Sequence, residues 1–435
     1  MQINHYKHYK LKEKIKAEGL IPNPFKVGEF TKEDININDH MRFLYPNTWV
    51  FHGDVVNKVL SGNYSAITPF CSEFVPTMNC SNRCRMCGYK SVKKLDGSWK
   101  RNDFLNPRIH MQDIGFAKSL LDKLIDGGVK GIIFTGGGDP VLFSGLEKLM
   151  AHATERKVDS VLYTNGNSLS INRIDEIIRT KPLLVRVSLN TGTEEIYNKL
   201  HCPLNKQTAF QGTLKTIEEF ARGAIDNPLM SVGVGFVINE INRHDLIETA
   251  LRIKEIKEKV GGGIEFVTYR PAVDYYNSQQ LPTELLDETC KIVETKVSEV
   301  LCGTGIRVRN LEMRYKALKQ NDKNYTECRG TGIFGELGPN GKMYLCCDRN
   351  TNPYYEIGDL TKNSLLDIYS GKQRKNLLDE INRGKCERCP PACKSHEVNK
   401  QFEDIERFRK AGELYIVKVW IEMQKEMPRP KMINF

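Results

Sequence analysis

The chain has 435 residues, of which 27% are charged and 40% hydrophobic, and its formal net charge is +10. This length exceeds what one hydrophobic core organises, so we expect one large domain with smaller additions. No apolar run approaches the roughly 20 residues that span a bilayer, and the 13 cysteines and the polar start at Met1 to Lys7 predict a cytoplasmic, reducing location. The positive charge favours anionic partners, but no basic block indicates nucleic acid.

Residues 1–70 predict a lead-in segment that packs on the main domain. A basic helix is expected from His8 to Glu18, followed by Pro22, Pro24 and a mixed apolar stretch that ends near Phe51. A module that binds the leader of a peptide substrate is the alternative. No complete set of helices and strands for such a module is visible in these residues.

From residue 72 onward, short β-rich runs alternate with helix-length amphipathic segments such as Met111 to Ile125. This alternation predicts parallel strands joined by crossover helices. The predicted strands are Glu73 to Met78, Gly131 to Thr135, Ser160 to Thr164, Leu183 to Leu189, Ser231 to Ile238 and Gly263 to Tyr269.

Three cysteines, Cys80, Cys84 and Cys87, fall within eight residues. Cysteine thiolates are the usual ligands of iron–sulfur clusters, and short spacings let several thiolates reach one cluster. Three ligands leave one iron open, and an open metal position can activate a small molecule. A zinc knuckle and a redox pair of Cys84 and Cys87 are the alternatives.

The spacing C-x3-C-x2-C, with Met86 before the third cysteine, resembles the signature of the radical S-adenosylmethionine superfamily. The resemblance implies an α/β fold, a partial (β/α)6 TIM-type barrel over residues 71–310. It also implies that the three cysteines hold a catalytic 4Fe-4S cluster, which chelates S-adenosyl-L-methionine. Reduction by a donor such as flavodoxin or ferredoxin would cleave that molecule to a 5′-deoxyadenosyl radical, which abstracts a hydrogen atom from the substrate.

A glycine-rich turn follows the second predicted strand, at the end where barrels of this type build their sites. Gly137, Gly138, Asp139 and Pro140 resemble the Gly-Gly-Glu-Pro motif of this superfamily, which holds the amino group of S-adenosylmethionine. Asp139 stands where glutamate is usual. We expect the glycines to permit positive φ and a close backbone approach.

Three later strand ends carry further residues that the resemblance assigns to S-adenosylmethionine. Asn165 belongs to a turn similar to the Thr-Asn-Gly turn of this superfamily. Ser188 and Asn190 resemble its Ser-Leu-Asp motif and would face the ribose and the carboxylate. Val234 and Phe236 would form an apolar wall for adenine. The alternatives are helix N-caps for the turns and a buried strand for the last pair.

A second set of cysteines follows residue 310 and surrounds the hairpin signal Pro339-Asn340-Gly341. This arrangement resembles the SPASM extension, or its shortened twitch form, which implies a small auxiliary-cluster domain over residues 311–400. A structural zinc site is the main alternative. Mapped onto this motif, the ligands of a second 4Fe-4S cluster are Cys328, Cys346, Cys386 and Cys389, with Cys347 and Cys393 as alternates. Residues 401–435 are expected to hold one helix, from Gln401 to Glu426.

Enzymes with this extension modify ribosomally made peptides or carbohydrates. We expect a peptide substrate from natural-product biosynthesis, because that class is large. One alternative is a carbohydrate or aminocyclitol dehydrogenase, dehydratase or epimerase, and another is a non-enzymatic zinc-stabilised binding protein. Cys202 is the candidate hydrogen donor to a substrate radical, although a small buried hydrophobic residue is the plainer interpretation.

Overall fold

The computed structural model describes residues 47–425, apart from 94–98, 102–108, 274–280, 311, 321, 322, 324, 350, 385, 388 and 391. The helix expected from His8 to Glu18 lies outside these residues. Within the described part of the chain, no helix combines the length and the apolar character that crossing a membrane requires.

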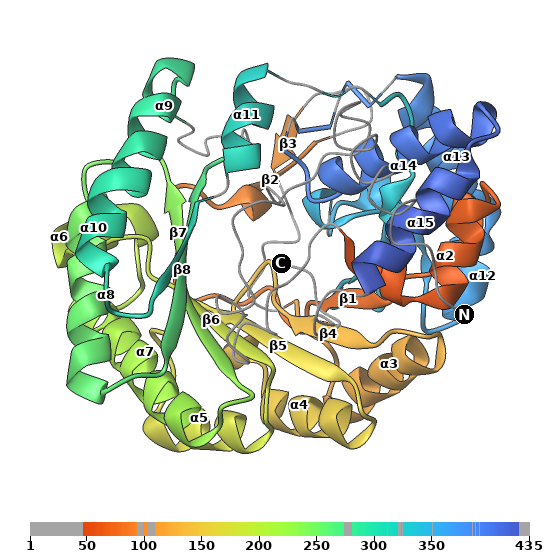
Figure 1. Cartoon of the computed structure of the whole chain (residues 1–435). Helices are drawn as coiled ribbons and strands as arrows, with labels where there is room; N and C mark the ends of the chain where they lie inside the picture. The colour runs from red at the N-terminus through yellow and green to blue at the C-terminus, as the bar shows by residue number, and fades with distance from the viewer. Residues whose placement is uncertain are drawn as a thin grey trace, which may run out of the picture.

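A ten-stranded sheet curves into an open barrel with helices on its outer side (Figure 1). The strand order is β12-β11-β10-β1-β4-β5-β6-β7-β8-β9, and neighbouring strands from β10 and β1 through to β9 run parallel. The core strands are β1 (Cys71–Phe74), β4 (Gly131–Phe134), β5 (Asp159–Thr164), β6 (Leu184–Ser188), β7 (Ser231–Ile238) and β8 (Ile264–Pro271), with β9 (Arg307–Asn310) beside β8. The fold is therefore the expected partial TIM-type barrel.

The first strand is the one whose predicted position is wrong by several residues. It ends at Phe74, because the residues after it leave the sheet and bond elsewhere, as Met78 does through its N–H to the carbonyl of Ile109 (2.8 Å). Ser91–Lys93 (β2) and Trp99–Arg101 (β3) form a separate two-stranded sheet.

The crossover helices cover the outer face of the sheet. The first of them begins at an N-cap, where the Asp113 carboxylate accepts a hydrogen bond from the N–H of Phe116 (2.8 Å). The helices are α3 (Ile114–Asp126), α4 (Leu146–Glu155), α5 (Ile171–Arg179), α6 (Glu194–His201), α7 (Ala209–Asp226), α8 (Leu246–Val260), α9 (Thr283–Ile292), α10 (Ser298–Leu301) and α11 (Glu312–Gln320).

Strand alternation gives the sheet two different faces. Outward side chains such as Phe134 and Val187 pack in one core with the crossover helices. Inward side chains such as Ile133, Val161 and Phe266 belong to a second core. The second core fills one part of the barrel interior and leaves the rest of the inner face to polar side chains.

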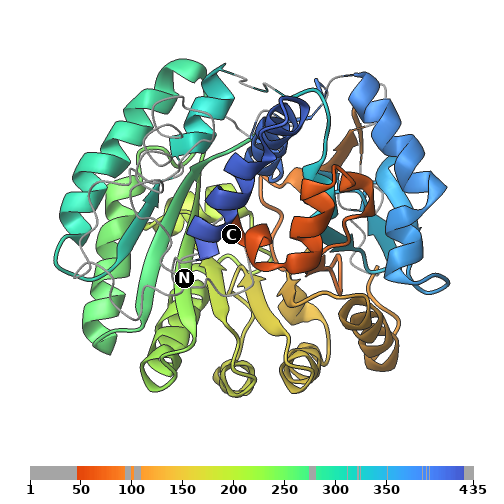
Figure 2. The same ribbon diagram turned by 45° about the vertical axis from the view of Figure 1, so that its right-hand side comes forward.

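Segments from both ends of the described chain build that second core. The 3-10 turn Asn47–Phe51 and α2 (Gly53–Leu60) pack with α14 (His396–Lys410) and α15 (Leu414–Lys425). The ring of Trp49 lies 5.3 Å from that of Phe402 and 6.0 Å from that of Trp420. Figure 2 shows α2 and α15 side by side in front of the barrel.

The single C-terminal helix expected from the sequence is two helices. The first ends before Gly412, which takes a φ of +75° and so redirects the chain. Because of this break, α15 turns back and reaches the 3-10 turn that contains Trp49.

The segment that carries the second cysteine set extends the barrel sheet. β10 (Phe334–Leu337) pairs with β1 in parallel, β11 (Lys342–Tyr344) returns beside it, and β12 (Glu356–Asp359) follows. The predicted Pro-Asn-Gly hairpin is present, closed by the Gly338 N–H on the Lys342 carbonyl (2.9 Å). Helices α12 (Leu365–Ser370) and α13 (Lys372–Arg383) complete this segment.

Candidate active site

The loop of residues 80–87, the cysteine loop, follows β1 at the C-terminal edge of the barrel. The carbonyls at the end of α6 hold it, because the N–H of Arg83 donates to His201 (2.9 Å) and that of Arg85 to Leu200 (2.9 Å). The loop after β7 adds a contact from the Asn239 amide to the sulfur of Met86 (3.4 Å). The end of α6 and the loop after β7 therefore fix the loop that carries the three cysteines.

The thiols of this loop have polar neighbours and buried surroundings. Cys80 Sγ accepts from the N–H of Asn82 (3.4 Å) and from Nδ2 of Asn165 (3.6 Å), and Cys84 Sγ lies 3.1 Å from Nδ1 of His201. Burial raises the pKa of Cys80 to about 12, and the nearby Asp139 adds to this rise. Thiols gathered at such a place ionise most readily when a metal supplies positive charge, so this donor set fits an iron–sulfur cluster.

The glycine-rich turn after β4 packs directly against the start of the cysteine loop. A Cβ on Gly138 would lie 2.1 Å from the carbonyl oxygen of Asn79, and one on Gly137 would lie 2.1 Å from Cε of Met78. Neither glycine has a positive φ. Of the two reasons given from sequence, the close backbone approach is the one that requires glycine here.

Asp139 connects this turn to the next one. Its carboxylate accepts from the Thr164 hydroxyl (2.9 Å), the N–H of Asn165 (2.8 Å) and the N–H of Val141 (3.2 Å), and the residue is 3% exposed. Asn165 in turn donates from Nδ2 to the hydroxyl of Ser81 (3.2 Å). The carboxylate that the resemblance assigns to the amino group of S-adenosylmethionine thus positions Asn165 against the cysteine loop.

Asp139 should also give the stability of the protein a pH dependence. Burial outweighs its hydrogen bonds and raises the pKa of this carboxyl from 3.8 to about 6, so the folded chain holds the proton more tightly than the unfolded chain. Its contribution to stability is complete below the unfolded pKa and is lost as the pH rises through about 6. Between pH 5 and pH 7.5 we expect the free energy of unfolding of the wild type, measured with urea, to fall by about 1 kcal/mol more than that of Asp139→Asn. An equal dependence of this free energy on pH in both proteins would contradict the prediction.

At the end of β6, Ser188 faces the barrel interior, whereas the side chain of Asn190 holds two strands together. Ser188 is half-buried, and its Oγ lies beside the inner side of Gly235. Asn190 is 2% exposed and takes a φ of +60°, which asparagine tolerates better than most residues. Its Oδ1 accepts from the N–H of Val237 (2.7 Å), so this side chain ties β6 to β7.

Val234 and Phe236 do not face the barrel interior. Both are fully buried in the core between sheet and helices, where the ring of Phe236 lies 5.2 Å from that of Tyr269. Strand alternation turns Gly233 and Gly235 inward instead. The expectation that the side chains of Val234 and Phe236 form a wall for adenine is therefore wrong.

Cys202 closes the C-terminal end of α6 with a φ of +42°. Its thiol is directed at the carbonyl of Lys199 (3.4 Å), at the end of its own helix. The contribution of Cys202 to the site runs through its backbone carbonyl, which accepts from the N–H of Arg83 (3.2 Å). These contacts give no support to a hydrogen-donor role for this thiol.

The second cysteine set gathers beside the β10–β11 hairpin. Burial raises the pKa of the Cys328 thiol to about 12, and the charge of Cys389 adds to the rise. Burial likewise raises the pKa of Cys386, on which Cys328 and Cys389 also act. Burial raises the pKa of Cys393 well above its usual range too, and Cys389 and Cys328 again contribute. A group of buried thiols that repel one another when ionised fits a second metal cluster.

The neighbouring residues Cys346 and Cys347 face different surroundings. The pKa of Cys346 is raised by burial, and Cys389 and Cys328 are among the charges that act on it. The pKa of Cys347 is also raised by burial, but the neighbours acting on it include Lys394 and Glu336. We therefore propose Cys346 as the cluster ligand and treat Cys347 as part of a different group.

Paired variants test this separation. Cys346→Ala should lose the auxiliary cluster, about four irons, because it removes a thiol on which the charges of Cys389 and Cys328 act. Cys347→Ala should keep the wild-type iron and sulfide content. Colorimetric iron and sulfide analysis of anaerobically reconstituted protein checks both, and the opposite pattern would reverse the assignment.

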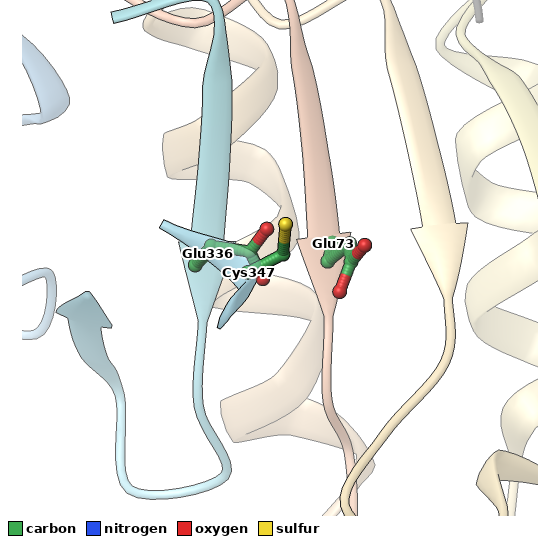
Figure 3. A group of neighbouring side chains, drawn as sticks. All are labelled: Glu73, Glu336 and Cys347. Carbon is green, nitrogen blue, oxygen red and sulfur yellow. The ribbon is translucent and has the colours of Figure 1, made fainter. Parts of the chain in front are cut away.

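An interior cluster of Glu73, Glu336, Cys347 and Lys394 was not found from the sequence. Figure 3 shows the side chains of Glu73, Glu336 and Cys347 as neighbours, on β1, on β10 and on the turn after β11. One oxygen of each carboxylate and the sulfur lie within 4.8 Å of one another. Lys394 Nζ lies 2.7 Å from Glu73 Oε1.

Further charged side chains continue this polar layer across the inner face. The guanidinium of Arg186 lies 3.6 Å from the ring centroid of Tyr163. Burial raises the pKa of Tyr163, while the charges of Arg186, Lys394 and Arg270 act to lower it. The interior thus places several cations around one buried phenol.

Comparison with known protein families agrees with this geometry. A family model described as the radical SAM superfamily matches residues 74–253, and one described as an iron-sulfur cluster-binding domain, SPASM, matches residues 328–390. Both are families of iron–sulfur proteins, which sets aside the zinc-stabilised binding protein considered from the sequence.

One curated protein is similar in sequence. The chain is 24% identical over 253 residues to dTDP-4-amino-4,6-dideoxy-D-glucose ammonia-lyase of Streptomyces venezuelae. The match covers 55% of this chain and 48% of that enzyme, so the chain spans about half the length of its curated relative.

Solved structures share the fold. The chain resembles Streptococcus suis SuiB bound to precursor peptide SuiA, with a TM-score of 0.56 and 14% identity over 87% of this chain and 79% of that one. SuiB bound to S-adenosylmethionine gives a TM-score of 0.53 and 14% identity over 74% and 70% of the two chains. Together with the family matches, the cysteine loop and the barrel, this likeness leads to one conclusion. Residues 74–253 form a radical SAM domain, of the superfamily of enzymes that use a 4Fe-4S cluster and S-adenosyl-L-methionine, and residues 328–390 form a SPASM-type domain for an auxiliary iron–sulfur cluster.

Proposed function

We propose that this enzyme modifies a carbohydrate, and that its substrate is an amino sugar linked to a nucleoside diphosphate. The polar layer inside the barrel carries the proposal. Arg186 and Lys394 can bind phosphate oxygens, and the carboxylates of Glu73 and Glu336 can accept hydrogen bonds from hydroxyl and ammonium groups. A small, anionic, polyhydroxylated molecule suits such a lining, and the net charge of +10 favours its approach.

The curated relative supports the same substrate class. Its name describes an enzyme that removes ammonia from a dTDP-linked amino sugar. A peptide substrate is expected from the sequence only because the class of peptide-modifying enzymes is large. The charged interior, in contrast, is a property of this chain.

The proposal gives each group of residues a role. Cys80, Cys84 and Cys87 hold the catalytic cluster. S-adenosylmethionine, when bound there and reduced with electrons from a cytoplasmic flavodoxin or ferredoxin, would supply the radical chemistry that removes a hydrogen atom from the sugar. The residues that line S-adenosylmethionine are Gly137, Gly138, Asn165 and Ser188, and those that hold the auxiliary cluster are Cys328, Cys346, Cys386 and Cys389.

The test compares how candidate substrates change the rate of 5′-deoxyadenosine formation. Reduced enzyme with S-adenosylmethionine receives dTDP-4-amino-4,6-dideoxy-D-glucose, the same nucleotide sugar without its amine, or a set of short peptides. We expect the amino sugar to raise the rate most and to be converted to a new product. Stimulation by peptides alone would overturn the proposal.

A further inference from the structure

The last residue of α6, His201, contacts the cysteine loop at two points. Its backbone carbonyl accepts from the N–H of Arg83 (2.9 Å), and Nδ1 of its ring lies 3.1 Å from Sγ of Cys84. The residue is 1% exposed, and the centroid of its ring lies 4.4 Å from that of Tyr197. Main-chain bonding and packing thus fix the position of this imidazole relative to the sulfur.

The other ring nitrogen of His201, Nε2, has two polar neighbours. The carbonyl oxygen of Leu189 lies 3.2 Å from it, and Nδ2 of Asn190 lies 3.3 Å from it. Oδ1 of Asn190 accepts from the N–H of Val237 (2.7 Å), so the amide presents its nitrogen to the ring. Nε2 can therefore donate to Leu189 or accept from Asn190, and these surroundings permit both neutral tautomers of the imidazole.

Binding of a metal by Cys84 selects one of these tautomers. A thiolate bound to iron has no proton and can only accept a hydrogen bond. The ring proton then resides on Nδ1 and is donated to the sulfur, while Nε2 accepts from Asn190. An aspartate, which stands at this position in the Ser-Leu-Asp motif, has no N–H to donate and would draw the ring proton to Nε2. Asparagine at position 190 therefore favours donation to Cys84.

The contact of His201 with Cys84 is also shorter than the contacts made by the neighbouring thiol. Sγ of Cys80 lies 3.4 Å from the N–H nitrogen of Asn82 and 3.6 Å from Nδ2 of Asn165. Because the strength of a hydrogen bond falls with distance, the imidazole should influence its sulfur more than these two donors influence theirs.

We propose that His201 is a positioning residue that donates a hydrogen bond from Nδ1 to the sulfur of Cys84 and thereby raises the reduction potential of the catalytic cluster. Reduction adds one electron, from a donor of the flavodoxin or ferredoxin class, and part of its charge falls on the thiolate sulfurs. A hydrogen bond to such a sulfur is stronger in the reduced state, so it makes the cluster easier to reduce. This inference rests on the proposed function for the cluster ligands Cys80, Cys84 and Cys87, but it does not depend on the sugar.

The test is an anaerobic redox titration of the reconstituted full chain, followed by EPR spectroscopy. The signal of the catalytic cluster is the one that added S-adenosylmethionine changes, which separates it from the signal of the auxiliary cluster. His201→Leu removes the donor and leaves a side chain that still packs. We expect its ratio of reduced to oxidised catalytic cluster at a fixed potential to fall about tenfold, which corresponds to a midpoint about 59 mV more negative.

Two further variants show whether the donor itself causes this shift. In His201→Asn the side-chain nitrogen takes the place of Nδ1, so the midpoint should stay close to that of the wild type. Tyr197→Phe keeps the ring beside His201 and loses only the hydroxyl bonded to Thr213 (2.8 Å), so its midpoint should not change. Equal midpoints in the wild type and His201→Leu would overturn the proposal. An equal shift in Tyr197→Phe would overturn it too, because any disturbance of α6 would then move the potential.

A second measurement detects the contact in the wild type. Pulsed EPR of protein that contains histidine labelled with the heavy nitrogen isotope should show a weak coupling between the catalytic cluster and a histidine nitrogen. His201→Asn should lose this coupling while it keeps the potential. Absence of the coupling in the wild type would overturn the role of His201 alone. A wild type with no signal sensitive to S-adenosylmethionine would contradict the cluster assignment in the proposed function, and this inference with it.

Discussion

Replacing Cys80, Cys84 and Cys87 together by alanine should abolish the formation of 5′-deoxyadenosine from S-adenosylmethionine. The three thiols share one loop, and the contacts that hold the loop are made largely by its backbone and by Met86. The variant should therefore fold, because the loop keeps its anchors when it loses its metal ligands. Chromatography of anaerobic, dithionite-reduced reactions gives the measurement.

The control is a variant in which Cys290 and Cys302 are replaced by alanine. These thiols lie on or after α9 and α10, away from both cysteine groups, and the variant should cleave S-adenosylmethionine at the wild-type rate. Cleavage by the triple variant at that same rate would show that the catalytic cluster is bound elsewhere.

Gly138→Ala should be nearly as damaging, although it removes no ligand. The added Cβ would lie 2.1 Å from the carbonyl oxygen of Asn79, a backbone atom next to Cys80 that has no rotamer by which to move away. The turn and the start of the cysteine loop must separate, which lowers the stability of the protein by about 1–3 kcal/mol. The protein should still fold. Because the displaced turn no longer lies in its place beside the cysteine loop, we expect the affinity for S-adenosylmethionine to fall by about tenfold or more.

Gly136→Ala provides the matched control in the same turn. Its Cβ would meet the Gly138 carbonyl oxygen and a methyl group of Val75 at 3.2 Å, which a shift of a few tenths of an ångström relieves. Isothermal titration of reconstituted protein with S-adenosylmethionine should separate the two variants. Equal affinities would mean that the approach of this turn to Asn79 does not shape the binding site.

The barrel could be predicted from sequence because its signals are local. The apolar runs that became β4, β5 and β7 are bounded by glycine and polar turns, and the helices between them have regular apolar spacing. The cysteine loop and its neighbouring turns were found for the same reason, since each is a short contiguous motif. The turn around Gly138 could be placed at the site, but the contact that makes glycine necessary there could not.

The interior cluster could not be predicted, because it depends on a pairing between distant parts of the chain. Glu73 and Glu336 are partners in the register of β1 and β10, and Lys394 enters from the segment before α14. Each of these residues looks like an ordinary surface charge in the sequence. Only the extension of the barrel sheet by β10 brings the two carboxylates together.

Side-chain direction limited two further predictions. Val234 and Phe236 were assigned to the correct strand, but alternation along β7 places them on its outer face. Cys346 and Cys347 could not be separated from sequence, because adjacent residues in a tight turn point in directions that only the three-dimensional structure defines.

The most direct test of this account is the metal content of the wild-type protein and of the Cys80, Cys84 and Cys87 triple variant, measured by Mössbauer spectroscopy with iron and sulfide analysis. We expect about eight irons in the wild type and about four in the triple variant, with sulfide in equal amount, since each cubane holds about four irons. Zinc without sulfide in the triple variant would contradict it, because the thiols around Cys328 would then form a structural zinc site.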